Sequence, residues 1–375
     1  MRMLYCSNCF TDIQIKAIID GTNADARKNV NHKIGNCNFC GATDVYVCDT
    51  SNGGPIEEYF NGLLDIYTPS YMLPHNFPKN KIGFIKDILH DRWHIFNLDI
   101  SENKIYDFIK SICAKKYSSN PMLFNSEVGV RQFCDTNYLE DNSILKNHNW
   151  DEFVENIKTV NRFHSSYINI EKLDDFLKYD VNPSYKEGRV FYRARICPNA
   201  GGYASDDMGA PPSCKAKDGR VNSKGIPVLY LSDSIETTLN EVRAEKYDYV
   251  TIARFRLKKD IKVIDLANIV NRISPFTDID YTQYAINIEH LEKIAEEISK
   301  PVRSNNEFDY IPTQYISDYI KSRKYDGIEY TSVMGEGGEN IAVFNPKELE
   351  CIRTEVYKID SIKYYTTPQI LLAEE

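Results

Sequence analysis

The sequence predicts an α+β protein in which a small cysteine-bearing segment and a helical domain precede a mixed α/β domain. Three observations support this order. Two Cys-x2-Cys pairs lie within the first 50 residues, apolar residues recur at helical spacing through residues 51–180, and strand-like runs alternate with helical runs after residue 185. We therefore expect domains at 1–50, 51–180 and 185–360.

Two cysteine pairs of equal spacing mark the first segment. Cys6 and Cys9 form one pair, Cys37 and Cys40 form the other, and Gly41 follows the last cysteine. Each pair can present two thiolates to one ion, and two pairs complete the tetrahedron that zinc prefers. Because four protein ligands leave no open position, we expect a structural zinc in a zinc-ribbon-like segment. The alternative is four free buried thiols.

Amphipathic runs indicate that residues 51–180 are mostly helical. Ile56, Phe60, Leu63 and Leu64 recur at the spacing of one helix face. Similar patterns occur over 105–113, 150–163 and 173–180. The polar stretch 182–188 contains turn-forming residues, and we interpret it as a linker.

Strands and helices alternate after this linker. We expect strands over 190–192, 228–231, 249–257, 328–330 and 341–344, and helices over 286–298 and 311–324. The apolar parity of the run 249–257 changes near Ala253, which predicts a β-bulge at that point.

Composition restricts the classes of function. The 45 basic and 54 acidic residues give a net charge of −9, which argues against a general nucleic-acid-binding surface but leaves a local basic patch open. The chain has no apolar stretch of about 18 residues, the length that predicts a membrane span. Ten cysteines without an export signal at the polar N-terminus are typical of the reducing cytosol. We therefore expect a cytoplasmic protein without a membrane segment.

Three arginines of the C-terminal half are candidates for binding an anion. Arg193 and Arg195 flank one position of an expected strand, so their side chains share a face. Arg220 lies in the turn Gly219–Asn222. Arginine suits phosphate because its planar fork binds two oxygens at once. Taken singly, Arg193 and Arg195 are each better explained by a surface ion pair.

A helix and a glycine-rich turn supply further polar candidates. Asp233 with Glu236 is typical of a helix N-terminus, and Glu241 falls on the flank of that helix, where a carboxylate can border a cleft. Tyr230 ends the strand before this helix, and Ser332 precedes a glycine-rich loop whose N–H groups can face an anion. Taken singly, Glu241 is better explained as a solvated helix residue, the alternative for Tyr230 is a core aromatic, and a glycine loop after Ser332 is a weak signal.

Four sequence blocks in this order resemble the RES domain, over residues from about 189 to 346. The blocks are Tyr192–Arg193, Gly219–Asn222, Tyr230–Val242, and Tyr330–Ser332 together with Asn340–Phe344. The RES family is named for its arginine, glutamate and serine and is similar in fold to ADP-ribosyltransferase toxins. Its members act on NAD, and many are toxins of bacterial toxin–antitoxin pairs. The resemblance therefore implies an ADP-ribosyltransferase-like fold, NAD as substrate, and an antitoxin or regulatory protein as a candidate partner.

The resemblance also assigns roles to residues of this chain. Arg193, Glu241 and Ser332 match the three family residues, and Tyr230 and Arg220 match further pocket positions. It implies that Glu241 stabilises the cation formed on the nicotinamide ribose, Arg193 holds a phosphate or ribose oxygen, and Arg220 holds the pyrophosphate. Tyr230 is expected to stack on nicotinamide, and Ser332 to hydrogen-bond within the pocket. The full expected site is catalytic Arg193, Tyr230, Glu241 and Ser332 with substrate-binding Arg195, Arg220, Asn222 and Asn340. One departure from the family is Val221, which stands where an aromatic residue is common.

The function that the resemblance implies is cleavage of the nicotinamide–ribose bond of NAD by a bacterial toxin or defence effector. Two alternatives remain: an ADP-ribosyltransferase that modifies a protein or nucleic acid, and a non-catalytic, zinc-stabilised binding module. Residues 51–180 also resemble the helical HEPN-type block that precedes RES in some longer bacterial proteins. We expect no ribonuclease, because Arg92 and Arg162 each precede a histidine too closely for the HEPN motif.

Overall fold

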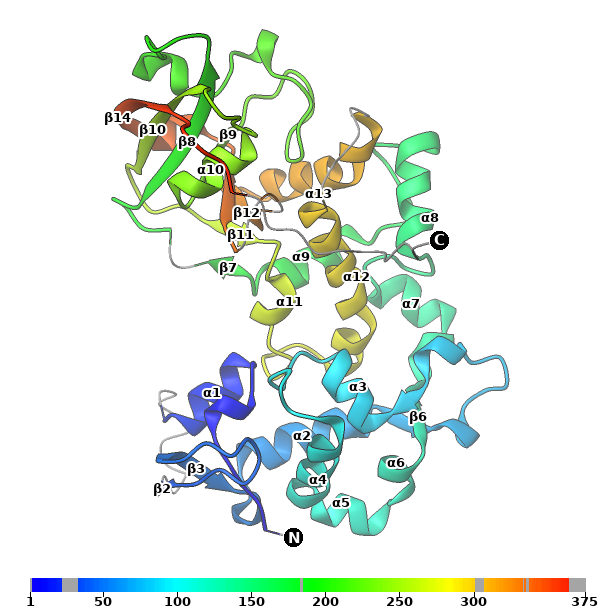
Figure 1. Cartoon of the computed structure of the whole chain (residues 1–375). Helices are drawn as coiled ribbons and strands as arrows, with labels where there is room; N and C mark the ends of the chain where they lie inside the picture. Colours follow the sequence, from blue (N-terminus) through cyan, green and yellow to red (C-terminus); the bar gives the residue numbers. More distant parts are fainter. Residues whose placement is uncertain are drawn as a thin grey trace, which may run out of the picture. The chain divides into compact units, whose positions relative to one another are not determined.

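The computed structural model describes residues 2–21, 33–182, 185–300, 307–332, 334 and 337–363. The chain forms two compact units, one of residues 1–180 with 268–296 and the other of residues 181–267 with 297–375. The second unit is therefore interrupted, whereas the sequence predicts a continuous domain over 185–360. The α+β class predicted from the sequence is confirmed, because helices and sheets both occur (Figure 1).

The first unit is mostly helical and carries two small three-stranded sheets. One sheet has the order β1-β3-β2 and the other the order β4-β6-β5. The second sheet lies inside the block predicted as helical, and its strands have two to four residues, too few to produce a recognisable alternation. The strands are β1 Leu4–Tyr5, β2 Lys33–Gly35, β3 Val45–Asp49, β4 Tyr67–Pro69, β5 Gly83–Phe84 and β6 Glu127–Val130. The helices are α1 Ile13–Ile19, α2 Pro55–Asp65, α3 Ile85–Asp91, α4 Glu102–Ile112, α5 Ala114–Ser119, α6 Met122–Asn125, α7 Thr136–Asn142, α8 Trp150–Glu155, α9 Ile170–Leu177, α11 Ile269–Arg272 and most of α12 Tyr281–Ser299.

An aromatic core joins the cysteine segment to the helices of the first unit. Phe39, which lies between two of the cysteines, stacks on Phe108 of α4 with ring centroids 5.0 Å apart. Phe10 packs against Phe96 at 5.3 Å, and Phe60 of α2 meets Phe108 edge-on. All five rings are buried. The cysteine segment therefore shares a hydrophobic core with the helices instead of folding around a metal alone.

Helix α12 joins the first unit because its buried side chains find their partners there. The ring of Tyr284 stacks on Trp93 with centroids 5.0 Å apart. The Asn287 side chain accepts a hydrogen bond from the backbone N–H of Ile144 at 2.6 Å. A buried polar group of this kind needs such a partner, so these contacts assign the helix to the first unit.

The second unit is built on an eight-stranded sheet of order β14-β10-β8-β9-β13-β12-β11-β7, in which β11 and β12 run parallel and the other pairs run antiparallel. Its buried core gathers Phe191, Leu231, Ile341 and Val343. Each expected strand and helix of this half has a counterpart. The elements are β7 Val181–Asn182, β8 Val190–Cys197, β9 Leu229–Ser232, α10 Ile235–Glu241, β10 Tyr249–Leu257, β11 Val263–Asp265, α13 Ile311–Ser322, β12 Gly327–Thr331, β13 Glu339–Val343 and β14 Leu349–Lys358.

The eight-stranded sheet parts between β8 and β9. Strand β8 pairs with β10 along its whole length, and β9 pairs with β13 along its whole length. Between β8 and β9, only Tyr192 and Ser232 are paired. Helix α10 contacts both of these strands (Figure 1). The sheet thus consists of two halves that diverge beside α10, and this divergence leaves space for a ligand.

The β-bulge expected near Ala253 lies close to that point, but its extra residue is on the partner strand. The register between β10 and β14 shifts between Arg254 and Phe255, where Arg353 and Cys351 are the respective partners. Ile352 is therefore the additional residue. Strand β10 itself pairs with β8 without a shift.

Candidate active site and metal centre

A cavity of about 630 Å³ opens where β8 and β9 diverge. Strand β8 contributes Arg193 to its lining, strand β9 contributes Tyr230 and Ser232, and helix α10 contributes Glu241 at its last turn. The remaining lining residues are Ala194, Gly219, Arg220, Leu231, Thr238, Val242, Arg243, Tyr310, Tyr330, Met334 and Asn340.

Helix α10 places Glu241 at the cavity because its apolar side chains face the sheet. Ile235, Leu239 and Val242 pack against a small core that includes Ala194, which leaves Glu241 on the flank of the helix. The pattern of Asp233 and Glu236 predicts Asp233 as the N-cap of this helix, and that prediction was wrong. Ser234, not Asp233, is the N-cap, and its Oγ accepts the N–H of Thr237 at 3.0 Å. Asp233 instead accepts a hydrogen bond from the Thr237 hydroxyl.

Two donors hold one oxygen of the Glu241 carboxylate. Ser332 Oγ donates to Oε1 at 2.6 Å, and Asn340 Nδ2 donates to the same oxygen at 2.7 Å. Both donor residues are buried, with 3% and 4% exposure. Within the described ranges, Oε2 of Glu241 accepts no hydrogen bond. The carboxylate is thus held through one oxygen and can present the other to a ligand.

Arg193 lines this cavity and forms no ion pair with any residue that the structure describes. Its Nη1 atom is shielded from solvent and has no hydrogen-bond partner among the residues that the structure describes. Burial, together with the charge of Arg195, lowers the pKa of Arg193 to about 10, so it remains protonated at neutral pH. A buried donor of this kind is costly without an acceptor. An anionic ligand would supply that acceptor.

Two further arginines line the cavity, and they differ in how they are held. Arg220 Nη1 donates to the backbone carbonyls of Ile298 and Lys300, the latter at 2.9 Å, and its guanidinium lies over the Tyr330 ring. Arg243 follows α10 in the left-handed backbone conformation, with φ +53°, which is uncommon outside glycine. Its side chain forms no hydrogen bond or ion pair with the described part of the chain. In a protein of net charge −9, three arginines and one glutamate give this lining a positive balance.

Tyr230 is fixed by its hydroxyl and presents its ring to the cavity. The hydroxyl donates to Asn222 Oδ1 at 2.7 Å and accepts the N–H of Val221 at 3.0 Å. Burial raises the pKa of Tyr230, so the hydroxyl stays protonated. Gly219 lies so close that a Cβ there would approach the Tyr230 hydroxyl to 2.7 Å, which only glycine avoids.

The expected site residues fall into two groups by position. Arg193, Tyr230, Glu241, Arg220 and Asn340 line the cavity. Arg195, Asn222 and Ser332 do not belong to the lining. Instead, Arg195 donates to the carbonyl of Asp207 and lies over the Tyr203 ring, Asn222 holds Tyr230, and Ser332 holds Glu241.

Sequence reasoning missed Arg243, Tyr310 and the wall formed by Tyr330. Val221 is buried and does not line the cavity, so the aromatic walls come from Tyr230, Tyr310 and Tyr330. The position of Arg243 directly after the expected helix was a usable signal. Tyr310 lies just before α13, and no local pattern connects it to the cavity.

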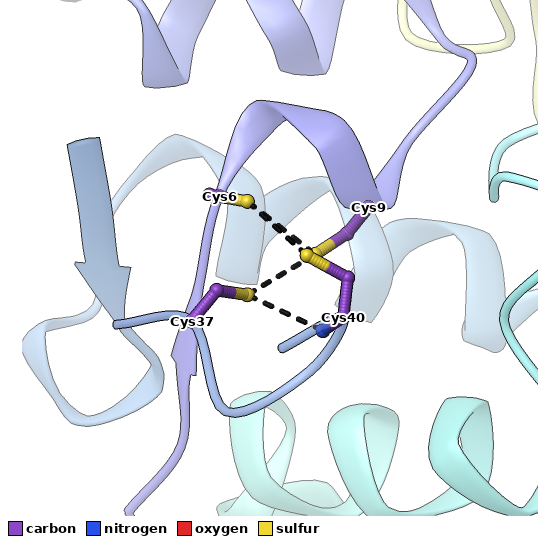
Figure 2. A group of neighbouring side chains, drawn as sticks. All are labelled: Cys6, Cys9, Cys37 and Cys40. Carbon is purple, nitrogen blue, oxygen red and sulfur yellow. Dashed lines mark hydrogen bonds between the residues drawn. The ribbon is translucent and has the colours of Figure 1, made fainter. Parts of the chain in front are cut away.

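The four cysteines of the first segment converge on one point (Figure 2). The sulfur atoms of Cys6 and Cys9 lie 3.9 Å apart, those of Cys6 and Cys40 3.5 Å, and those of Cys9 and Cys37 3.4 Å. All four lie within 4.8 Å of one another. A tetrahedral site with Zn–S bonds of about 2.3 Å requires sulfurs about 3.8 Å apart. The four thiols can therefore hold a metal ion.

The local backbone and the acidity of the thiols agree with a metal site. Cys40 N–H donates to Cys37 Sγ at 3.4 Å, and Gly41 completes the turn with φ +86°. Burial and the neighbouring thiol of Cys40 raise the pKa of Cys6 to about 12, while the hydrogen bond from Cys9 lowers the pKa of Cys37 to about 4. Without a cation, the crowded sulfurs cannot all ionise. A bound divalent cation stabilises all four thiolates together.

Comparison with known proteins bears on the second unit. Residues 190–364 match the family model of the RES domain. This part of the chain is a RES domain. The match includes every residue of the cavity lining and leaves residues 51–180 outside, so their HEPN-type resemblance stays a prediction.

The chain shares 13% identity and a TM-score of 0.30 with a chain of the crystal structure of the M. tuberculosis MbcT-MbcA toxin-antitoxin complex, over 49% of this chain and 91% of that one. No curated protein matches the sequence.

Among the described helices, none is both long and apolar enough to cross a bilayer.

Proposed function

We propose that the RES domain cleaves the N-glycosidic bond between nicotinamide and ribose in NAD. The observation that carries this proposal is the charge arrangement of the cavity. A half-buried Arg193, whose Nη1 has no partner among the described residues, and an accessible Arg243 line the same cavity as Glu241, and Oε2 of Glu241 accepts no hydrogen bond from the described residues. A dinucleotide with a pyrophosphate and a reacting ribose presents the complementary set of groups. The family of the domain supports the same substrate.

Glu241 acts on the charge that develops at the ribose. As the C1′–N bond breaks, nicotinamide leaves as a neutral molecule with the bonding electron pair, and the ribosyl group becomes oxocarbenium-like. Oε2 of Glu241 accepts a hydrogen bond from a ribose hydroxyl, and the carboxylate stabilises the cation. Because Ser332 and Asn340 already hold Oε1, the carboxylate needs no reorganisation as the charge forms.

The arginines and tyrosines bind and orient the substrate. Arg193 receives a phosphate or ribose oxygen as the acceptor that its Nη1 lacks. Arg220, held by backbone carbonyls at one nitrogen, directs its remaining N–H groups to the pyrophosphate. The Tyr230 ring stacks on nicotinamide. Water captures the ribosyl cation and loses a proton to solvent, or another nucleophile takes its place.

The metal site serves stability in this proposal. Four thiolates with no open position favour a structural zinc, held by Cys6, Cys9, Cys37 and Cys40. The aromatic core next to these cysteines connects the zinc to the fold of the first unit.

The test is incubation of the purified protein with NAD and quantification of nicotinamide and of the ADP-ribosyl product. Glu241→Ala is the inactive control. Release of nicotinamide together with ADP-ribose or a phosphorylated ADP-ribosyl product supports the proposal. Absence of nicotinamide with the wild-type protein, with or without phosphate and cell extract, refutes it.

A second function of the same cavity is transfer of ADP-ribose to a macromolecule. The observation that favours it is the accessible Arg243 at the cavity, beside which an acceptor can bind. Nicotinamide release only in the presence of protein or nucleic acid would favour transfer. A non-catalytic binding module predicts no release under any condition. In either enzymatic case, the RES family supports a role as a toxin or defence effector with an antitoxin or regulatory protein as partner.

A further inference from the structure

Ser232 is a buried hydroxyl next to the candidate catalytic carboxylate that has no assigned role. It is the last residue of β9 and is 2% exposed. In the register of β9 and β13 it lies directly opposite Asn340. Its Oγ donates to Asn340 Oδ1 at 2.7 Å, and Asn340 Nδ2 donates in turn to Glu241 Oε1 at 2.7 Å. Three side chains therefore form one chain of hydrogen bonds that ends on Glu241.

We infer that Ser232 is a positioning residue that sets the orientation of the Asn340 amide and, through it, of the Glu241 carboxylate. This inference rests on the proposed NAD-cleaving function. Ser232 acts without touching the reacting atoms, because its hydroxyl is occupied by Asn340.

The physical reason is that the two ends of a carboxamide have almost the same shape and opposite hydrogen-bonding character. In the observed orientation, Nδ2 faces Glu241 and Oδ1 faces Ser232. The reversed orientation would place Oδ1 against the Glu241 carboxylate. Both oxygens are hydrogen-bond acceptors, so they would repel each other. With Ser232 absent, Oδ1 loses its donor in a buried site, which removes the contact that stabilises the observed orientation.

The consequence for catalysis follows from the number of donors on Oε1. Ser332 and Asn340 together fix the plane of the carboxylate and leave Oε2 for the substrate. If the amide rotates, Ser332 alone remains, and the carboxylate can turn about that single bond. Residues that orient the ligands of a metal site typically change activity by about 10–100-fold, and we expect an effect of this size for a residue that orients a catalytic carboxylate.

The experiment compares Ser232→Ala, Ser232→Thr and Asn340→Leu in the full chain, with nicotinamide release as the activity. Ser232→Ala is expected to lower kcat about 10–100-fold and to leave KM within about twofold, because substrate contacts are unchanged. Ser232→Thr keeps the hydroxyl and is expected to restore most of kcat. The double variant Ser232→Ala/Asn340→Leu is expected to lose no more than Asn340→Leu alone, since both changes break one chain of bonds. Ser317→Ala, which removes a buried hydroxyl bonded to the Thr313 carbonyl, is the control and is expected to keep full activity.

A second readout does not depend on turnover. In protein labelled with 15N-asparagine, the side-chain NH2 of Asn340, assigned from its loss in Asn340→Leu, is expected to exchange slowly with solvent. Ser232→Ala is expected to accelerate this exchange and shift the resonance. An unchanged Asn340 signal in folded Ser232→Ala, or multiplicative losses of kcat in the double variant, would overturn the inference. If the wild-type protein releases no nicotinamide, the proposed function fails, and the Asn340 signal still decides whether Ser232 orients the amide.

Discussion

Replacement of Arg193 by methionine is expected to stabilise the free protein and to weaken its activity. Methionine retains most of the apolar stem and removes the charge. In the free protein, that charge is desolvated and Nη1 has no acceptor within the described ranges. An enzyme that keeps such a cation pays in stability for a group that only the ligand satisfies.

The magnitude follows from the pKa of Arg193, which burial lowers from 12.5 to about 10. At 1.36 kcal/mol for each pKa unit, the lowered pKa corresponds to a loss of about 3 kcal/mol in the free energy of unfolding. Solvent screening of the half-buried side chain reduces this loss to about 1–2 kcal/mol. Because the pKa of Arg193 is lower in the folded protein, the unfolded chain binds more protons between about pH 10 and 12.5. The loss of folding stability caused by the Arg193 charge therefore disappears only above this pH range. The full cost is therefore present at pH 7.

The assay is urea unfolding of the wild-type protein, Arg193→Met and Arg193→Lys at pH 7, together with KM for NAD. Arg193→Met is expected to gain about 1–2 kcal/mol in the free energy of unfolding and to raise KM at least about tenfold, through loss of a charge-assisted hydrogen bond. Arg193→Lys keeps the charge and is expected to show a smaller change in stability. A less stable Arg193→Met protein with unchanged KM would show that Arg193 is satisfied within the fold and does not await a ligand.

Three other perturbations test separate parts of the structure. Cys6→Ser and Cys37→Ser are expected to lose bound zinc by metal analysis, whereas Cys214→Ser, exposed and outside the cluster, keeps it; unchanged stoichiometry in the first two would exclude the metal site. His290 is buried against Ser143, and burial lowers its pKa to about 4, so between about pH 4 and 6.5 the unfolded chain binds an extra proton. The free energy of unfolding should then fall by up to about 3 kcal/mol as the pH drops through this range, and urea curves of His290→Gln should lack this component; an identical pH dependence in the variant would contradict the assignment. Gly338→Ala would place a Cβ 2.3 Å from Thr237 Oγ1 and is expected to lower the free energy of unfolding of the RES domain by about 1–3 kcal/mol. The control is Gly209→Ala, where the atom nearest to the new Cβ lies at 4.0 Å, and equal stability of the two variants would show that the loop adjusts freely.

The agreement between sequence and structure is closest where local pattern decides the structure. The bounds of β10, Tyr249–Leu257, coincide with the expected strand because β-branched and aromatic residues fill its length. The short strands β4, β5 and β6 were not predicted, because two to four residues are too few to show the alternation of apolar and polar residues that marks a strand. The sequence also does not predict that most of α12 belongs to the first unit. Its apolar face indicates that the helix is buried, but not which elements it packs against.

The candidate site shows the same division between local and non-local information. The family blocks identified Arg193 and Glu241, yet their convergence depends on where β8 and β9 part, which no local pattern encodes. Arg243 and Ser232 lie within or next to those blocks, but their importance follows only from the cavity and from the register of β9 and β13.

The rate of nicotinamide release from NAD by Glu241→Gln relative to Glu236→Gln decides whether Glu241 acts on the reacting ribose. Both positions lie on α10, and both changes remove one charge while preserving shape, but only Glu241 lines the cavity. We expect Glu236→Gln to match the wild-type rate and Glu241→Gln to be slower by about 100–1,000-fold. Equal rates for the two variants would contradict the assignment of Glu241 as the group that stabilises the ribosyl cation.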